Sequence, residues 1–347
     1  MITILDDNFS QLNAFVEIKK PSKLILLADE NTHTHCLPIL LSNLQSDIPF
    51  EIIEIEAGEE LKNIETATQL WEILSDFEVD RKTLIINLGG GVISDLGGFV
   101  ASTYKRGVSF INVPTTLLAM CDAAIGGKTG IDHQFLKNII GTFAQPEHIF
   151  IFPEFLKTLP YTELRSGFAE MLKHGLIADK THWVDLTAIS ELRSEKIASF
   201  IGKSTQIKQD IVQQDFKEQN LRKTLNFGHT VGHAIESLFL MTGRPIPHGE
   251  AIAIGMICET RLSYLNGLIS ENICKDVVSQ IQRFFPLHDI SHFSGEEILT
   301  LMSNDKKNSF GEISFSLLNG IGSSCYDQRV SRTEIVEVLD YYQLLSV

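Results

Sequence analysis

The stretch Thr83-Leu-Ile-Ile-Asn-Leu-Gly-Gly-Gly-Val-Ile-Ser-Asp-Leu-Gly-Gly98 passes from an apolar run directly into glycines and then into a helical pattern. A short apolar run of this kind is typical of a buried strand in a parallel sheet. Glycines 89–91 would let backbone N–H groups approach a diphosphate closely, and the following helix would add a partial positive charge. The alternative is a tight turn needed only for packing. We favour a phosphate site, because the three glycines directly follow a buried strand.

Alternating strand and helix patterns surround this stretch over the first 150 residues. Strand patterns cover residues 22–29, 50–56 and 108–113, and helical patterns cover residues 31–44 and 58–77. This alternation predicts a doubly wound α/β domain, in which ligands bind outside the carboxyl ends of the strands. The glycines do not spell G-x-G-x-x-G, and the strand that ends in an acid, at Asp29, precedes them instead of following them. A standard Rossmann domain is therefore not predicted.

The second half of the chain has a helical pattern. Apolar residues recur three and four positions apart, as over residues 164–172. One late strand pattern covers residues 312–318, and a closing helix is expected over residues 332–344. Pro153 and Pro160 bracket the change of pattern. We therefore expect an α/β domain over residues 1–157 and a mainly helical domain over residues 158–347.

The stretch Leu225-Asn-Phe-Gly-His-Thr-Val-Gly-His-Ala-Ile-Glu236 carries two histidines four residues apart. On a helix, His229 and His233 would share one face, with Glu236 a turn further on. A third histidine, His248, follows in Pro245-Ile-Pro-His-Gly-Glu250, where two prolines and a glycine fix the backbone at the start of an apolar helix. Two solvent-facing histidines would look the same in the sequence, but the third histidine favours a metal site.

Several charged residues allow more than one interpretation. Asp122-Ala-Ala-Ile-Gly-Gly-Lys-Thr129 lacks the first glycine of a nucleoside-triphosphate loop, so Lys128 is either an anion-binding group or part of a solvated turn. Glu170 and Lys173 are one helical turn apart, which alone is typical of a surface ion pair. The same default applies to Lys208, Arg222 and the pair Lys306-Lys307.

The formal net charge of −15 argues against a nucleic-acid or anionic-membrane partner, because those partners need a broad basic face. Basic residues close in sequence to the histidines and glycines would suit a small anionic substrate. The cysteines are odd in number and form no C-x-x-C pair, which indicates free thiols in a reducing compartment. The start of the chain has no signal-peptide pattern, and no apolar run reaches about 18 residues, so we expect a cytoplasmic protein without a membrane span.

Several segments of the chain together resemble one family. They are Gly90-Gly-Val-Ile-Ser-Asp95, Pro114-Thr-Thr-Leu-Leu118, Ile125-Gly-Gly-Lys-Thr129, Lys137-Asn138, Gly167-Phe-Ala-Glu-Met-Leu-Lys173, Leu225 to His233 and His248-Gly-Glu250. In order and spacing they resemble 3-dehydroquinate synthase, of the sugar-phosphate cyclase superfamily, from about Asp29 to Gly322. Ser94 and Gly97 stand where many members have Gly and Ala, and Ala123-Ala124 where many have a serine pair. We expect these departures to affect local packing and loop hydrogen bonds and not the type of reaction.

The resemblance implies an α/β, Rossmann-like NAD-binding N-terminal domain and an all-α, metal-binding C-terminal domain, with the active site in the cleft between them and a homodimer as the assembly. The implied enzyme is a carbon–oxygen lyase acting on phosphates. It would convert 3-deoxy-D-arabino-heptulosonate 7-phosphate to 3-dehydroquinate and phosphate, in the shikimate pathway to the aromatic amino acids. NAD would be regenerated in each turnover, and Zn2+ or Co2+ would polarise the hydroxyl group that is oxidised.

The resemblance also implies roles for individual residues. Glu170, His229 and His248 would bind the metal, so that His233 becomes a substrate-side residue in proton transfer. The NAD contacts would be Asp29, Asn31, Glu59, Lys62, Gly90, Gly91, Val92, Asp95, Thr115, Thr116, Lys128, Lys137 and Thr158. The substrate-binding and catalytic groups would be Asp122, Lys128, Asn138, Lys173, Lys208, Arg222, Asn226, His233 and one of Lys306 and Lys307, with Arg106 reaching across the dimer interface.

Three alternatives stay open. Other sugar-phosphate cyclases have similar NAD and metal sites, and metal-dependent polyol dehydrogenases share the two-domain plan but release NADH. A non-catalytic NAD- or metal-binding regulator would lack part of the ligand set. The full set of residues from Asp122 to Lys307 favours 3-dehydroquinate as the product.

Overall fold

The computed structural model of the protein describes residues 1–133, 136–303 and 313–346. The chain divides into two compact units, Met1–Pro160 and Tyr161–Val347. Within the described residues, no helix combines the length and the apolar character needed to cross a membrane. The five cysteines are free, and all of them except Cys325 are buried, as the sequence predicts.

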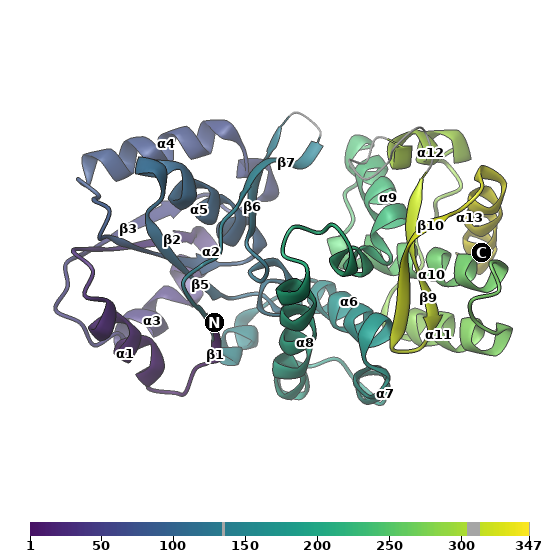
Figure 1. The fold of residues 1–347 in the computed structure, drawn as a ribbon, viewed down its shortest axis with the longest axis horizontal. Coiled ribbons are helices and arrows are strands. Elements are labelled where there is room, and N and C mark those ends of the chain that lie inside the picture. Colours follow the sequence, from purple (N-terminus) through teal and green to yellow (C-terminus); the bar gives the residue numbers. More distant parts are fainter. Residues whose placement is uncertain (134–135, 304–312, 347) are drawn as a thin grey trace. The chain divides into compact units, whose positions relative to one another are not determined.

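The N-terminal unit is built on a six-stranded parallel sheet (Figure 1). The strand order is β1-β8-β5-β4-β2-β3, and the neighbouring strands run parallel. The strands are β1 (Ile2–Ile4), β2 (Leu24–Asp29), β3 (Phe50–Ile55), β4 (Leu84–Gly89), β5 (Ser109–Pro114) and β8 (Ile149–Ile151). The central strands β2, β4 and β5 are almost entirely buried, which explains why their sequences form continuous apolar runs.

Helices and a separate hairpin complete this unit. The helices are α1 (Ser10–Lys19), α2 (Glu30–His35), α3 (Leu37–Asn43), α4 (Ile64–Asp76) and α5 (Gly91–Thr103), with the short turns η1 (Glu59–Leu61), η2 (Tyr104–Arg106), η3 (Ala119–Ala123) and η4 (Pro153–Thr158). The hairpin pairs β6 (Lys128–His133) with β7 (Leu136–Phe143) antiparallel. A core of buried apolar side chains that includes Ile25, Leu70, Ile85 and Leu96 joins the sheet to α4 and α5.

Two asparagines lie side by side in the middle of this apolar sheet. Asn87 of β4 and Asn112 of β5 occupy the same register, and the Asn87 Nδ2 group donates to Asn112 Oδ1 at 3.0 Å. The Asn112 amide in turn donates to the carbonyl of Ala124 at 3.3 Å, which ties the chain after η3 to the sheet. Gly97 of α5 packs directly on this pair, because a Cβ atom there would lie 2.1 Å from Asn87 Oδ1.

The C-terminal unit is helical apart from one hairpin (Figure 1). Its helices are α6 (Tyr161–Ala178), α7 (Lys180–Thr187), α8 (Ser194–Gln214), α9 (His229–Met241), α10 (His248–Leu265), α11 (Glu271–Phe284), α12 (Gly295–Ser303) and α13 (Arg332–Ser346), with the short turn η5 (Leu221–Asn226). The hairpin pairs β9 (Ser314–Gly320) with β10 (Ser323–Arg329) antiparallel. Helix α10 is central: it is buried along most of its length and packs against α6, α9, α11 and α13.

The predicted fold class is confirmed, with local differences. The helix expected over residues 58–77 is a short turn followed by α4, because Asn63 caps the helix and its side chain accepts from the Thr66 amide at 2.9 Å. The helix expected over residues 31–44 is divided into α2 and α3, and the second of these has a proline at its start. The sequence analysis did not predict β1, β8, the β6–β7 hairpin or β10.

Candidate functional site

Three potential metal ligands converge from three helices of the C-terminal unit. Glu170 lies on α6, and His229 and His248 are the first residues of α9 and α10. One ligand atom from each of them lies within 4.8 Å of the others. The Nε2 atoms of His229 and His248 lie 3.4 and 3.5 Å from Oε1 of Glu170. A carboxylate and two imidazoles arranged in this way form a donor set typical of catalytic zinc sites.

Glu170 is a fully buried carboxylate beside a buried ammonium group. The side chains of Glu170 and Lys173 are 0% and 2% exposed and form an ion pair one turn apart on α6. Burial alone would raise the pKa of Glu170, but Lys173 and His229 hold that pKa well below its usual value. The pair is therefore not the surface ion pair that its spacing alone suggests. Its carboxylate stays ionised, as a metal ligand must be.

The two histidines are oriented through their second ring nitrogen. Nδ1 of His229 lies 3.2 Å from the carbonyl of Phe227, and Nδ1 of His248 lies 3.5 Å from Oε2 of Glu236. Such contacts fix the ring and leave Nε2 directed at Oε1 of Glu170, where a metal would be bound. Burial would lower the pKa of His248, but Glu236 and Glu170 raise it to about 10, whereas burial and Lys173 lower the pKa of His229.

The residues present fit a divalent metal ion. Among the described residues, neither carboxylate oxygen of Glu170 accepts a hydrogen bond of ordinary geometry, although both are buried. Burying a carboxylate without such hydrogen bonds is unfavourable unless a cation compensates its charge. Lys173 pairs with Oε2 of Glu170 and so compensates one side of the carboxylate. A divalent cation held by Glu170, His229 and His248 would supply this compensation on the other side, where both histidines approach Oε1 of Glu170.

His233 lies next to this set but is compatible with two roles. Its ring centroid is 5.0 Å from that of His229 and 5.9 Å from that of His248. His233, Glu236 and His248 also bring ligand atoms within 4.8 Å of one another, a set that shares His233 and Glu236 with the face suggested by the histidine spacing but not His229. Because His233 is exposed and Glu170 is buried, the set that contains Glu170 is the better shielded from water.

Other predicted substrate-binding residues occupy buried positions in the same unit. Lys208 on α8 is 6% exposed and Arg222 in η5 is 3% exposed. The Arg222 guanidinium donates to the carbonyl of Phe216 at 2.6 Å, and the Asn226 amide donates to Glu218 Oε1 at 3.0 Å. These contacts hold the turn before α9 in place. Lys306 and Lys307 lie outside the described residues.

In the N-terminal unit, the predicted phosphate-binding glycines lie where β4 ends and α5 begins. A Cβ atom at Gly90 would lie 3.0 Å from Cγ2 of Thr116, so a side chain at this position would press on Thr116. The amide of Thr115 donates to the carbonyl of Gly89 at 3.0 Å, which brings the ends of β4 and β5 together. The buried Thr115 hydroxyl has no hydrogen-bond partner within residues 1–133, 136–303 and 313–346. A glycine cradle beside such a hydroxyl fits a bound diphosphate.

A buried lysine organises a second group of predicted nucleotide contacts. Lys62 is 3% exposed, and its Nζ atom lies 2.8 Å from Asp95 and 3.6 Å from Glu59. Burial would lower the pKa of Lys62, but the carboxylates of Asp95 and Glu59 raise it above its usual value. Lys137 of β7 approaches Glu59 at 3.9 Å. The structure thus brings together four of the residues expected to contact NAD.

The remaining predicted residues of this unit are more scattered. Gly91, Val92 and Asp95 lie in the first turns of α5, Asp29 ends β2 and caps α2, and Asn31 lies in α2. Asp122 lies in η3, Lys128 begins β6, and Asn138 of β7 has a left-handed backbone and donates its amide to Asp132 at 2.6 Å. Thr158 forms no hydrogen bond or ion pair with the other predicted NAD contacts, and Arg106 forms none with the other predicted substrate contacts, in the described part of the chain.

Two contacts that the sequence analysis did not predict join α10 to α6. Glu250 pairs with Arg165 and also accepts from Nε2 of His288 at 2.6 Å, and the Gly249 amide donates to the Ser166 hydroxyl at 2.8 Å. They fix the first turn of α10, which begins with His248, against the helix that carries Glu170. The sequence feature that could have indicated these contacts is Glu250 in His248-Gly-Glu250, to which the sequence analysis gave no role of its own.

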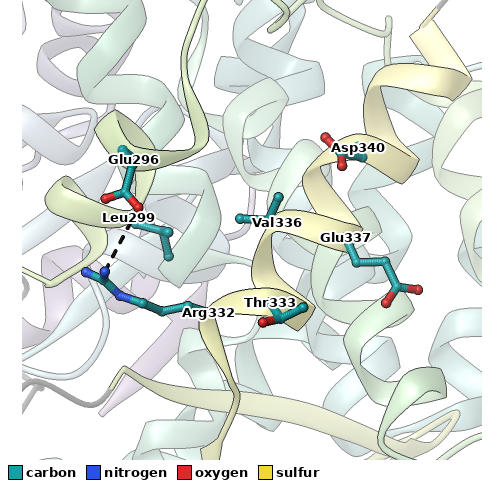
Figure 2. A pocket seen from close by; sticks show the side chains of 7 residues that line it. All are labelled: Glu296, Leu299, Arg332, Thr333, Val336, Glu337 and Asp340. Atoms are coloured by element: carbon teal, nitrogen blue, oxygen red, sulfur yellow. Dashed lines mark ion pairs between the residues drawn. The ribbon is translucent and has the colours of Figure 1, made fainter.

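A separate hollow lies between α12 and α13 and is shown in Figure 2. Its volume is about 440 Å³, and it is lined by Glu296, Leu299, Arg332, Thr333, Val336, Glu337 and Asp340. Arg332 approaches Glu296 at 4.0 Å, but both side chains are mostly exposed, so this ion pair contributes little to stability. The hollow shares no residue with the predicted sites, and we assign it no role.

Comparison with known proteins shows the family of this chain. The family model for the 3-dehydroquinate synthase N-terminal region matches residues 52–166, and that for the C-terminal region matches residues 167–308. The 3-dehydroquinate synthase of Parabacteroides distasonis is 42% identical over 349 residues, which cover 99% of this chain and 97% of the relative.

Two solved structures are similar over nearly the whole chain. ValA, the 2-epi-5-epi-valiolone synthase of Streptomyces hygroscopicus subsp. jinggangensis with NAD+ and Zn2+ bound, has a TM-score of 0.89 and 26% identity, with coverage of 99% of this chain and 97% of ValA. A 2-deoxy-scyllo-inosose synthase complexed with carbaglucose-6-phosphate, NAD+ and Co2+ has a TM-score of 0.84 and 25% identity, with coverage of 97% and 95%. On the evidence of both family models and a relative that matches along almost its full length, this chain belongs to the 3-dehydroquinate synthase family.

Proposed function

We propose that this protein is a 3-dehydroquinate synthase. As a carbon–oxygen lyase acting on phosphates, it converts 3-deoxy-D-arabino-heptulosonate 7-phosphate to 3-dehydroquinate and phosphate, in the shikimate pathway to the aromatic amino acids. The observation that carries this proposal is the convergence of Glu170, His229 and His248 beside the buried Lys173, in a chain that belongs to this family. The cofactors are NAD and a divalent metal, Zn2+ or Co2+, which the similar structures contain.

The residues of the C-terminal unit supply the metal site and the cationic groups. When bound, the metal supplies Lewis-acid polarisation of the substrate hydroxyl, and NAD supplies the hydride acceptor. Glu170, His229 and His248 hold the metal. Lys173, Lys208 and Arg222, with one of Lys306 and Lys307, bind the phosphate and carboxylate groups, because cationic donors make strong charge-assisted hydrogen bonds to such anions. Asn226 is a further, neutral substrate contact. His233 is exposed next to the metal set and can exchange a proton with the substrate.

The residues of the N-terminal unit bind NAD. Gly90 and the neighbouring Gly91 and Val92 present backbone amides to the diphosphate, and the Thr115 hydroxyl provides a further donor. The remaining NAD contacts are Asp29, Asn31, Glu59, Lys62, Asp95, Thr116, Lys128, Lys137 and Thr158. Asp122, Lys128 and Asn138 are the substrate contacts that we propose from this unit.

The test is phosphate release from the heptulosonate 7-phosphate, with and without NAD and after chelation, while NADH absorbance is followed. The proposed function requires phosphate release that depends on both cofactors, without accumulation of NADH. Steady NADH formation would identify a polyol dehydrogenase instead, and release from other sugar phosphates only would identify a different cyclase. Failure of release with every substrate, in protein that holds metal and NAD, would favour a binding protein without activity.

His248→Ala tests the ligand set directly. We expect this variant to lose the metal and the activity and to keep its fold, because His248 is partly exposed at the start of α10. His292→Ala, at an exposed histidine of the same unit, is the control and should keep a full equivalent of metal. A His248→Ala variant that binds metal as well as the control would show that the ligand set is wrong.

We also propose a cytoplasmic homodimer in which Arg106 contributes to the partner's site. Arg106 follows α5 with an exposed side chain and a φ of 66°. Arg106→Ala should lower turnover, and mixing it with His248→Ala should restore part of the activity if subunits exchange and Arg106 serves the partner. Mixed dimers without any recovery would assign Arg106 to its own subunit.

A further inference from the structure

We propose that Glu259 positions the metal ligand His229. Glu259 lies on α10, is 0% exposed, and is not among the residues to which the resemblance gives a role. The inference rests on the metal site of the proposed function and extends it to a residue that does not itself contact the metal. It concerns the contacts that hold the first turn of α9, which carries His229.

Helix α9 begins without a cap of its own. Its N-cap residue is Gly228, which has no side chain and a φ of 81°, so it cannot accept from the first amides of the helix. The carboxylate of Glu259 takes this place from another helix. Oε2 accepts from the Gly228 amide at 2.6 Å, and Oε1 accepts from the Val231 amide at 3.2 Å. The negative charge also lies at the positive end of the α9 dipole.

The two helices come this close because glycines face each other. A Cβ atom at Gly255 would lie 1.8 Å from the carbonyl oxygen of Gly228. Gly255 is one turn before Glu259 on the same face of α10, so the close approach delivers the carboxylate to the start of α9. At Gly228 a side chain would require the unfavourable left-handed backbone and would also lie 2.6 Å from Met256.

His229 lies between the two amides that Glu259 binds. Its ring is fixed in addition by the contact of Nδ1 with the Phe227 carbonyl at 3.2 Å. A shift of the first turn of α9 would therefore move Nε2 away from Glu170, from which it is now 3.4 Å distant.

Helix α10 thus supplies one ligand and positions another. His248 is its first residue, and Glu259 further along the same helix holds His229. The Gly249 amide donates to Ser166 on α6, the helix that carries Glu170. The buried helix α10 therefore carries one ligand and contacts the helices that carry the other two. The distances between the three ligands are thus set by helix packing and not by loops.

The experiment compares two carboxylate-to-amide variants, Glu259→Gln and Asp179→Asn. Asp179 caps α7 by accepting from the His182 amide at 2.9 Å, so it is a carboxylate cap, more exposed than Glu259, on a helix without a proposed metal ligand. Zinc affinity is measured by competition with a chromophoric chelator, and the Co2+ form is measured by visible absorption. We expect Glu259→Gln to weaken zinc binding by about 10- to 100-fold and to change the Co2+ spectrum, while Asp179→Asn leaves both unchanged.

Thermal unfolding of the metal-free proteins separates positioning from general stability, because both variants weaken a helix cap. Equal zinc affinity of folded Glu259→Gln and wild type would overturn the inference, as would equal losses of affinity in both variants. Should Glu259→Gln not fold, Glu259→Asp takes its place. Its shorter side chain keeps the negative charge but moves it away from the amides of Gly228 and Val231. Zinc affinity and the Co2+ spectrum are measured in the same way. Wild-type protein that binds no zinc would instead refute the metal site of the proposed function.

Discussion

Replacing Glu170 by Gln should destabilise the metal-free protein strongly as well as remove a proposed metal ligand. The substitution keeps the size of the side chain and one acceptor oxygen but removes the charge that faces Lys173. Lys173 is 1% exposed, so its ammonium group would stay buried beside a neutral amide. The structure therefore predicts two separable losses, one in metal binding and one in folding.

The magnitude follows from burial. Removing one partner of a buried ion pair costs about 3–5 kcal/mol, because the other charge remains out of water. Gln retains an acceptor for Lys173, so we expect the lower end, about 3 kcal/mol. With a urea slope of about 2 kcal/mol per molar, this corresponds to a shift of the midpoint by about 1.5 M.

The assay is urea unfolding of chelated protein, followed by tryptophan fluorescence. The chain has two tryptophans, and a Trp71→Phe background leaves Trp183, which is 2% exposed in α7 of the C-terminal unit, as the reporter. The control is Glu271→Gln. Glu271 forms an ion pair with Lys275 one turn on in α11 at 2.7 Å, but both of these side chains are more than half exposed.

The two variants should differ sharply, since both remove the carboxylate of a Glu–Lys pair about one turn apart on a helix, and only the Glu170 pair is buried. Glu271→Gln should leave the midpoint almost unchanged, because water screens an exposed pair. A Glu170→Gln midpoint equal to that of Glu271→Gln would refute the argument from burial. It would mean that water reaches Lys173 in the metal-free protein.

Two further predictions concern the nucleotide site and acid stability. Gly90→Val should weaken NAD binding in calorimetry by more than about tenfold, because the new side chain would press on Thr116 and fill the cradle; unchanged affinity would place the diphosphate elsewhere. His182 is buried in α7, and its burial together with the nearby His174 lowers its pKa to about 4. As the pH falls below 6.5, His182 is therefore protonated in the unfolded chain before it is protonated in the folded protein. Stability should therefore decrease between about pH 6.5 and 4 by up to about 3 kcal/mol, and His182→Leu should flatten this part of the profile; an equally steep profile in the variant would exclude His182 as the cause.

The parts of the fold that depend on local sequence were predictable. The passage from β4 through Gly89–Gly91 into α5 is one continuous segment, and apolar periodicity and glycines are enough to place it. Strands β1 and β8 have three residues each, which is too short for any periodicity to appear. The β6–β7 hairpin was missed because Gly126 and Gly127 directly before it predict a turn and not the start of a strand.

The candidate site was predictable only in part, because its residues are distant in the sequence. His229 and His233 share a helix face, and that local spacing indicated a metal site. Nothing local connects Glu170 to them, and only the family resemblance did so. Glu259 gave no signal, since a glutamate in an apolar helix shows neither its burial nor the amides of α9 that it binds.

The asparagine pair in the sheet has a consequence for how the N-terminal unit assembles. In a half-exposed sheet, the alternation of apolar and polar residues determines the register of neighbouring strands. Strands β4 and β5 are buried almost throughout, so a register shifted by one residue would still pair apolar residues with apolar residues. Asn87 and Asn112 remove this degeneracy, because each misaligned pairing would bury two amides without their mutual hydrogen bond, at about 1–3 kcal/mol for each group left unsatisfied. The pair therefore favours the observed register over slipped ones, and this register brings together the ends of β4 and β5, where we propose that NAD binds.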